Sequence, residues 1–147
     1  HTRDLKDYGG IAKVMPWFAI VFMIMTLSSV ALPGTNGFVG EFLILLGTWK
    51  TDPRLGAICA TGVILGAVYM LWVVQKMMFG PLGNRENEKL EDLSVREIAV
   101  MSPLVVAVFV MGIFPGLFFS KMEPSVQRFL ARVQVAQAAP IAVTQNE

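Results

Sequence analysis

The strongest constraint on this chain is a run of nineteen residues, 14–32, that carries no charged side chain. As a helix this run would measure about 28 Å, close to the ~30 Å hydrocarbon core of a bilayer. Two further hydrophobic stretches follow at 55–79 and 98–119. Only 16% of the residues are charged, against about a quarter in a typical soluble domain. The chain is therefore predicted to be an all-α membrane protein.

The first hydrophobic segment is interrupted at Pro33-Gly34, within a stretch PGTNG that a straight helix does not accommodate. Apolar character resumes over 38–49, but twelve residues reach only about 18 Å as a helix and cannot span alone. Either 14–49 is one discontinuous transmembrane helix, or its first part spans and its second part is re-entrant. We favour the discontinuous span, whose broken backbone must face protein or a water-filled cavity.

The remaining segments complete a prediction of three transmembrane helices and one amphipathic helix. Residues 1–13 form a polar loop, entered without an initiator Met, so we expect a C-terminal piece of a longer protein. Residues 80–97 form a charged loop, in which Ser94 and Glu97 match a capping box that opens the helix at 98–119. Residues 120–147 are expected to form an interfacial amphipathic helix and a flexible tail.

Charge placement gives an orientation and excludes several classes of function. Seven Lys and Arg side chains fall on the side of the N-terminal segment and five on the other, which predicts a cytoplasmic N-terminal side. No basic stripe points to nucleic acid. The single histidine, His1, provides no hydrolase base, and the lone Cys59 is interpreted as an apolar filler. No metal-binding pattern is present in the sequence.

The chemistry of the chain is expected to depend on Glu41, the one ionisable residue between Lys13 and Lys50. An ionised carboxylate is costly in lipid, so such a residue faces a bundle interior or an aqueous path and is functional by default. Gly37 and Gly40 leave room beside it for water or a neighbouring helix. We predict that Glu41 takes up and releases a proton or another cation. The alternative is a structural carboxylate that hydrogen-bonds the opened backbone near the break.

The sequence resembles a known family over two stretches. HTR at 1–3, DYGGIA at 7–12 and MP at 15–16 are similar to a loop-to-helix entry in antiporter-like membrane subunits of respiratory complex I, the proton-translocating NADH:quinone oxidoreductase. ALPGTNGFVGEF at 31–42 resembles the broken helix of that family. Sibling subunits and sodium/proton antiporters typically place a lysine where this chain has Glu41, so the carboxylate favours the M-type branch.

The resemblance implies a fourteen-helix subunit, of which this chain would supply helices twelve to fourteen, with helix twelve discontinuous. Glu41 matches the position that ends the subunit's central series of protonatable residues. The implied function is proton translocation by an enzyme complex that reduces quinone elsewhere, with no flavin, iron–sulfur cluster, quinone or metal in this chain. The implied partners are the other membrane subunits of complex I, the N-terminal part of the same subunit and the bilayer.

Two alternatives to this function stay open. One is a subunit of a multisubunit sodium/proton antiporter, which has no redox partner. The other is a purely structural membrane module, in which Glu41 could be replaced without loss of ion movement.

Overall fold

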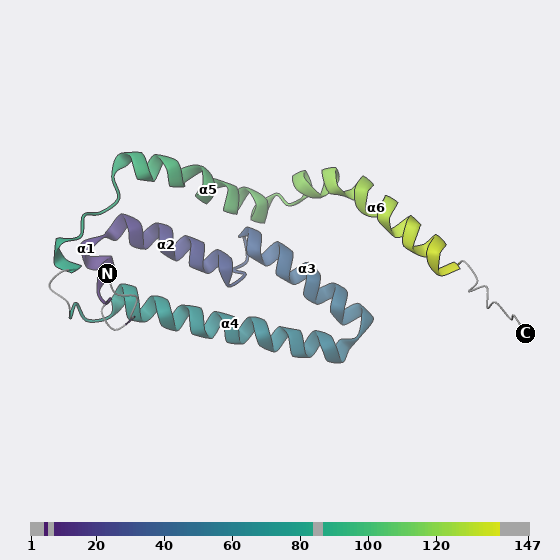
Figure 1. Ribbon diagram of the computed structural model, residues 1–147, viewed down its shortest axis with the longest axis horizontal. Coiled ribbons are helices and arrows are strands. Elements are labelled where there is room, and N and C mark those ends of the chain that lie inside the picture. The colour runs from purple at the N-terminus through teal and green to yellow at the C-terminus, as the bar shows by residue number, and fades with distance from the viewer. Residues whose placement is uncertain (1–4, 6–7, 84–86, 139–147) are drawn as a thin grey trace, which may run out of the picture. The chain divides into compact units, whose positions relative to one another are not determined.

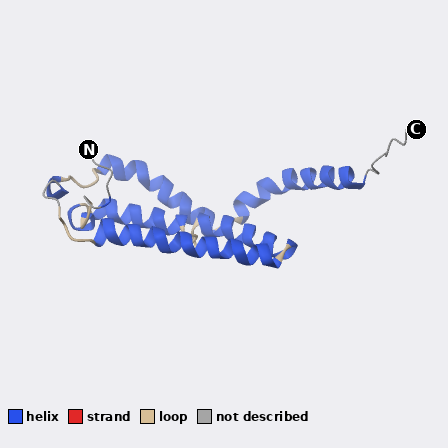
Figure 2. Cartoon of the chain, turned by 60° about the horizontal axis from the view of Figure 1, so that its bottom comes forward, coloured by secondary structure: helices blue, strands red, loops and turns tan. Residues whose placement is uncertain are grey.

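The chain folds into helices joined by short connections, as a computed structural model of residues 5, 8–83 and 87–138 describes, the side chains of 135–138 excepted (Figure 2). The helices are α1 (Ile11–Val14), α2 (Pro16–Ser29), α3 (Asn36–Thr51), α4 (Pro53–Phe79), the short 3-10 helix η2 (Asn87–Lys89), α5 (Val95–Ile113) and α6 (Gly116–Ala138). The described residues include no strand. The prediction of an all-α fold is confirmed.

The chain divides into two compact units, residues 1–113 and 114–147. In the first unit α2 and α3 follow one another, α4 runs back alongside both, and α5 lies against α2 and α3 (Figure 1). The reversal between α3 and α4 is short because Asp52 caps α4, accepting the N–H of Arg54 at 2.8 Å, and Pro53 occupies the first turn, where its missing N–H costs least.

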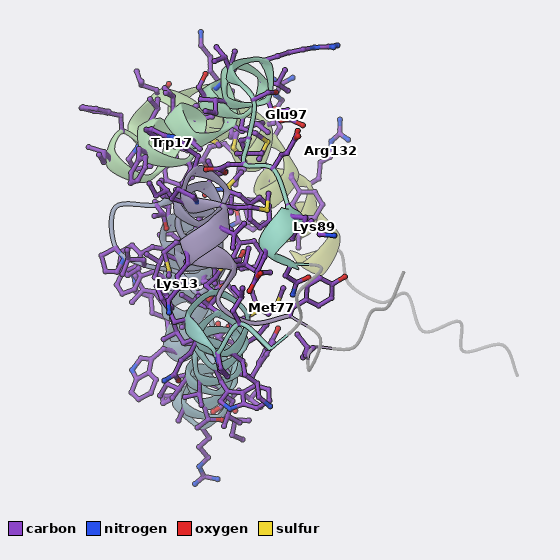
Figure 3. The ribbon with its side chains drawn as sticks, turned by 90° about the vertical axis from the view of Figure 1, so that its left-hand side faces the viewer. Lys13, Trp17, Met77, Lys89, Glu97 and Arg132 are labelled. Atoms are coloured by element: carbon purple, nitrogen blue, oxygen red, sulfur yellow. The ribbon has the colours of Figure 1, made fainter. Side chains whose placement is uncertain are left out.

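The buried apolar contacts of the first unit gather at the end that holds α1. Ile11, Val74 and Met78 form a buried cluster, against which Met15 and Phe18 pack among others. Pro16 begins α2, as its position in the sequence predicted. Figure 3 looks onto this end, where Lys13 and Trp17 are labelled. The cluster joins α1, α2 and α4 and so fixes the start of α2, which is the first half of the interrupted segment.

Most large apolar side chains lie on the outside of the helices. Ile44 is 70% exposed, Leu65 67% and Ile58 65%. Large apolar side chains exposed in such numbers indicate contact with lipid or with another protein. By length and composition α4 and α5 can each cross a membrane, whereas α2, with 14 residues, is apolar but short. Two candidate spans are thus found within the described residues, and the predicted count of three is not confirmed.

The boundaries near the C-terminus differ from the predicted ones. The segment predicted as one helix at 98–119 is divided: α5 already starts at Val95 and ends at Ile113, and α6 starts at Gly116. Pro115 lies at this division because it has no N–H to continue the helical hydrogen bonding. The amphipathic helix was predicted to lie within 120–147, yet α6 already starts at Gly116 and contains Pro124 in its interior. The predicted tail beyond Ala138 lies outside the described residues.

Candidate functional site

The interruption between α2 and α3 occupies residues 30–35, where the sequence predicted it. Two of its residues adopt a positive φ, Ala31 at 58° and Gly34 at 93°. Glycine tolerates that region, whereas alanine pays a backbone penalty of roughly 1–2 kcal/mol. The left-handed conformations of these two residues therefore interrupt the helix, which resumes at Asn36. Pro33 lies between these two residues and is exposed.

Hydrogen bonds within the interruption satisfy much of the opened backbone. The Ala31 N–H donates to the Ser28 carbonyl at 3.2 Å and the Leu32 N–H to the Leu27 carbonyl at 3.0 Å. The carbonyl of Leu32 accepts both the N–H of Thr35 at 3.1 Å and its hydroxyl at 2.7 Å. These bonds matter because an unpaired backbone group is expensive at membrane depth.

Polar side chains join the two sides of the interruption. The Ser28 hydroxyl donates to Oδ1 of Asn36, linking the last turn of α2 to the first turn of α3. Thr26, Ser28 and Thr35 are all buried, with Thr35 only 2% exposed. Every buried side-chain nitrogen and oxygen in the described part of the chain has a hydrogen-bond partner. The interruption is thus a closed, hydrogen-bonded connection and not an open gap.

Three helices approach one another at the interruption with only glycine hydrogens between their backbones. A Cβ at Gly37 would overlap the carbonyl oxygen of Ser28 and lie 3.1 Å from its carbonyl carbon. A Cβ at Gly112, in α5, would lie 2.5 Å from the carbonyl carbons of Gly34 and Thr35. The interrupted backbone therefore faces protein on these sides, as a break at membrane depth requires.

The four glycine and proline residues assigned to the break do not all lie in it. Pro33 and Gly34 do, but Gly37 and Gly40 belong to the first two turns of α3. The space beside Gly37 is filled by the Ser28 carbonyl of the neighbouring helix α2, which is one of the two predicted alternatives, and not by water. Nothing in the described chain comes within 4 Å of a Cβ built at Gly40.

Glu41 lies in the second turn of α3 and is half-buried. The rings of Phe38 and Phe42, on the same helix, stack with their centroids 5.2 Å apart. Within the described residues the carboxylate of Glu41 makes no hydrogen bond and no ion pair. The alternative in which Glu41 bonds the backbone near Thr35 and Asn36 is therefore not realised there. Its predicted role in proton transfer stays a prediction.

Asp92 is a structural residue that the sequence analysis missed, because the whole charge run of 80–97 was interpreted as a solvated loop. Its carboxylate accepts the backbone N–H of Trp17 at 2.9 Å and of Phe18 at 3.1 Å. It thereby caps α2, whose own N-cap residue, Met15, offers no capping side chain. The missing local cap was the one available signal, but it did not identify the partner.

The environment of Asp92 changes its acidity. Desolvation raises the pKa of its carboxyl, but hydrogen bonds from the backbone N–H groups of Trp17, Leu93 and Phe18 outweigh that effect and lower the pKa below 3.8.

The neighbouring capping box is confirmed: Glu97 accepts the Ser94 N–H at 2.8 Å and the Ser94 hydroxyl at 2.7 Å. Asp92 and Ser94, two residues apart in one loop, therefore cap the starts of α2 and α5.

We predict that Asp92→Asn lowers the melting temperature of the chain at neutral pH. A carboxyl whose pKa is depressed in the folded state stabilises it above the unfolded value of 3.8, and this contribution disappears as the pH falls through the folded pKa. Thermal unfolding in detergent micelles, followed by circular dichroism over a pH series, measures the difference. Parent and variant should converge at low pH, and Glu91→Gln in the same loop should behave as the parent. A difference that persists at the lowest pH would contradict the assignment.

A groove of about 630 Å³ lies between α2 and α5, apart from Glu41 and the interruption. Apolar residues such as Phe18, Phe22 and Met101 form most of its wall, with Arg96 and Glu97 beside them. Neither Glu41 nor the interruption lines the groove. Cys59 is exposed and unpaired, and the described residues hold no group of three potential metal ligands.

Known proteins resemble this chain in both sequence and structure. Residues 1–67 match the family model described as NADH:quinone oxidoreductase/Mrp antiporter, TM. NADH-quinone oxidoreductase subunit M of Rhodobacter capsulatus is 40% identical over 126 residues, which cover 86% of this chain and 25% of that protein. NADH-ubiquinone oxidoreductase chain 4 of Marchantia polymorpha is 39% identical over 129 residues, 88% of this chain and 26% of that one.

A solved structure agrees with these relatives. A chain of respiratory complex I from Thermus thermophilus with bound NADH matches with a TM-score of 0.75 and 36% identity, over 82% of this chain and 25% of that chain. The chain thus spans about a quarter of the length of the relatives it matches. The resemblance inferred from the residues at 1–16 and 31–42 is confirmed: the first 67 residues match the NADH:quinone oxidoreductase/Mrp antiporter family model, and most of the chain is similar to subunit M and chain 4 of these oxidoreductases and to a chain of respiratory complex I.

Proposed function

We propose that this chain is the proton-exit end of an antiporter-like membrane subunit of NADH:quinone oxidoreductase, in which proton translocation is coupled to quinone reduction elsewhere in the complex. The observation that carries the proposal is Glu41, a half-buried carboxylate two turns into α3 and directly after an interruption closed by protein contacts. The names of the relatives, subunit M and chain 4, favour the oxidoreductase over the sodium/proton antiporter that shares the family.

The arrangement in the membrane follows from this proposal. α2 and α3 together form one discontinuous span, α4 and α5 form the next two, and the apolar outer faces contact lipid, the rest of the same subunit and neighbouring membrane subunits. The subunit lies in a bacterial inner membrane with the N-terminal side of this chain in the cytoplasm. The chain contributes no redox cofactor, so electron transfer belongs to other subunits.

Proton transfer at Glu41 is governed by the charge of its surroundings. In a medium of low dielectric constant a carboxylate holds or releases its proton according to nearby charges. When a lysine in the preceding part of the subunit becomes protonated, the anionic form of Glu41 is stabilised and its proton leaves toward the outer side. When that lysine loses its charge, Glu41 is reprotonated. The hydrogen-bonded interruption holds α3 in place while this exchange occurs.

A chimeric subunit tests the proposal. The matching quarter of the Rhodobacter capsulatus relative is replaced by this chain, and NADH-driven acidification of inverted membrane vesicles is recorded together with electron transfer. We expect acidification comparable to that of the parent subunit, whereas a subunit without this segment should give none. Electron transfer without acidification in an assembled complex would contradict the proposal. Proton movement driven by a sodium gradient in the absence of NADH would favour the antiporter.

A further inference from the structure

Gly112 marks the closest approach of α5 to the interruption between α2 and α3. It precedes the last residue of α5 and lies directly against the peptide that joins Gly34 to Thr35. A Cβ added there would lie 2.5 Å from two carbonyl carbons and closer still to the carbonyl oxygen of Gly34. Because the contacted atoms are all backbone, no side-chain rotation can relieve the overlap.

Tight contacts of this kind are not general among the helical glycines of the chain. Nothing in the described residues lies within 4 Å of a Cβ built at Gly40 or Gly47 in α3, or at Gly62 or Gly66 in α4. Within the described part of the chain, the steric requirement for glycine at 112 therefore comes from the interruption itself. It does not come from a general demand for small residues along the helices.

The contact reaches Glu41 through a short and stiff path. Thr35 is 2% exposed and is held by its hydroxyl bond to Leu32, and Asn36 follows it as the first residue of α3. Glu41 lies five residues further along the same helix. A displacement of the peptide at Gly34–Thr35 must therefore move or rotate the start of α3, and the carboxylate moves with it.

We propose that Gly112 is a positioning residue for Glu41: α5 presses its backbone against the interruption and thereby sets where α3 begins and where the carboxylate lies. The placement of Glu41 matters to activity only if the proposed function holds, but the placement itself can be measured separately. To regain an ordinary contact of 3.4 Å from 2.5 Å, Gly112→Ala requires a shift of at least about 0.9 Å, and the nearer carbonyl oxygen of Gly34 requires more. A misplacement of about 1 Å can lower a rate by about a hundredfold.

Cysteine labelling at position 41 tests the placement without relying on proton pumping. In the full-length chimeric subunit, Cys59→Ser removes the one cysteine of this chain and Glu41→Cys introduces the reporter. The rate of reaction with a charged, water-soluble maleimide is compared with and without Gly112→Ala. We expect Gly112→Ala to change this rate severalfold and Gly47→Ala, in open space on α3, to leave it unchanged.

Thr35→Ala is the second variant, in case Gly112→Ala prevents assembly. It removes the buried hydroxyl bond on the other side of the same contact without adding an atom, and we expect it to change the labelling rate as well. An unchanged labelling rate in the assembled Gly112→Ala subunit would overturn the proposal. If Gly112→Ala does not assemble, an unchanged rate in Thr35→Ala would do the same.

Proton pumping with Glu41 intact separates this proposal from the proposed function. We expect Gly112→Ala to lower acidification about tenfold or more in an assembled complex, and Gly47→Ala to leave it unchanged. If labelling at position 41 changes but acidification persists, the positioning holds and the function of Glu41 fails. If labelling does not change while Glu41→Gln abolishes acidification, the function holds and the positioning fails.

Discussion

Replacing Glu41 by glutamine in the chimeric subunit is expected to lower NADH-driven acidification by at least about a hundredfold while the complex still assembles. The amide keeps the size and most of the hydrogen-bonding capacity of the carboxylic acid, but it cannot give up a proton. Because the carboxylate of Glu41 makes no hydrogen bond or ion pair within the described chain, the substitution removes no such interaction there. Electron transfer should fall with acidification, since the proposed function couples the two.

Two comparisons make the result for Glu41 decisive. Glu91→Gln removes the same charge from the exposed loop before α5 and should leave both rates unchanged. Glu41→Asp keeps the ionisable group one methylene shorter and should retain part of the acidification. If acidification and electron transfer both survive Glu41→Gln, Glu41 is a structural residue and the chain belongs with the purely structural membrane modules.

The largest effect on folding is expected for Gly37→Val. The added side chain would have to occupy the position of the Ser28 carbonyl, which is backbone and accepts the N–H of Ala31. The first turn of α3 would therefore separate from the last turn of α2, and the hydrogen bond between Ser28 and Asn36 would be lost. We expect the free energy of unfolding to fall by about 3 kcal/mol or more. The measurement is the amount of assembled subunit in the membrane, which should be little or none.

Gly40→Ala is the matched control for Gly37→Val. Gly40 lies three residues later in the same helix, and nothing described lies within 4 Å of a Cβ built there. Alanine favours a helix over glycine by about 1 kcal/mol, so this variant should assemble as well as the parent or better. Equal assembly of Gly37→Val and the parent would show that the close approach of α2 and α3 is not required.

Local patterns in the sequence predicted the parts of the fold that depend on neighbouring residues. The run from Pro53 to Phe79 forms one long helix because it is apolar and contains no interior proline or helix-ending glycine. The interruption followed from Pro33 and Gly34, which disfavour a straight helix. The capping of α5 by Ser94 and Glu97 followed from their spacing of three residues.

Features that depend on distant residues could not be predicted in this way. The requirement for glycine at 112 arises from the peptide between Gly34 and Thr35, which no spacing rule connects to it. The end of α5 at Ile113 is, by contrast, a local feature: Pro115 has no N–H to continue the helix, although the apolar residues beyond it favoured a longer one. The proposed role of Glu41 rests on charges outside this sequence, so spacing rules within the chain could not establish it.

The hydrogen bonds of Asp92 have a consequence for the order in which the membrane domain forms. The carboxylate that caps α2 lies 75 residues after Trp17, so α2, α3 and α4 must all leave the ribosome before the cap exists. Until then the first N–H groups of α2 need water or another acceptor, which keeps this helix end at the membrane surface. The start of α2 is therefore capped only after α4 and the loop that follows it have been synthesised. Nascent chains arrested before and after residue 92 should differ in how firmly α2 is held.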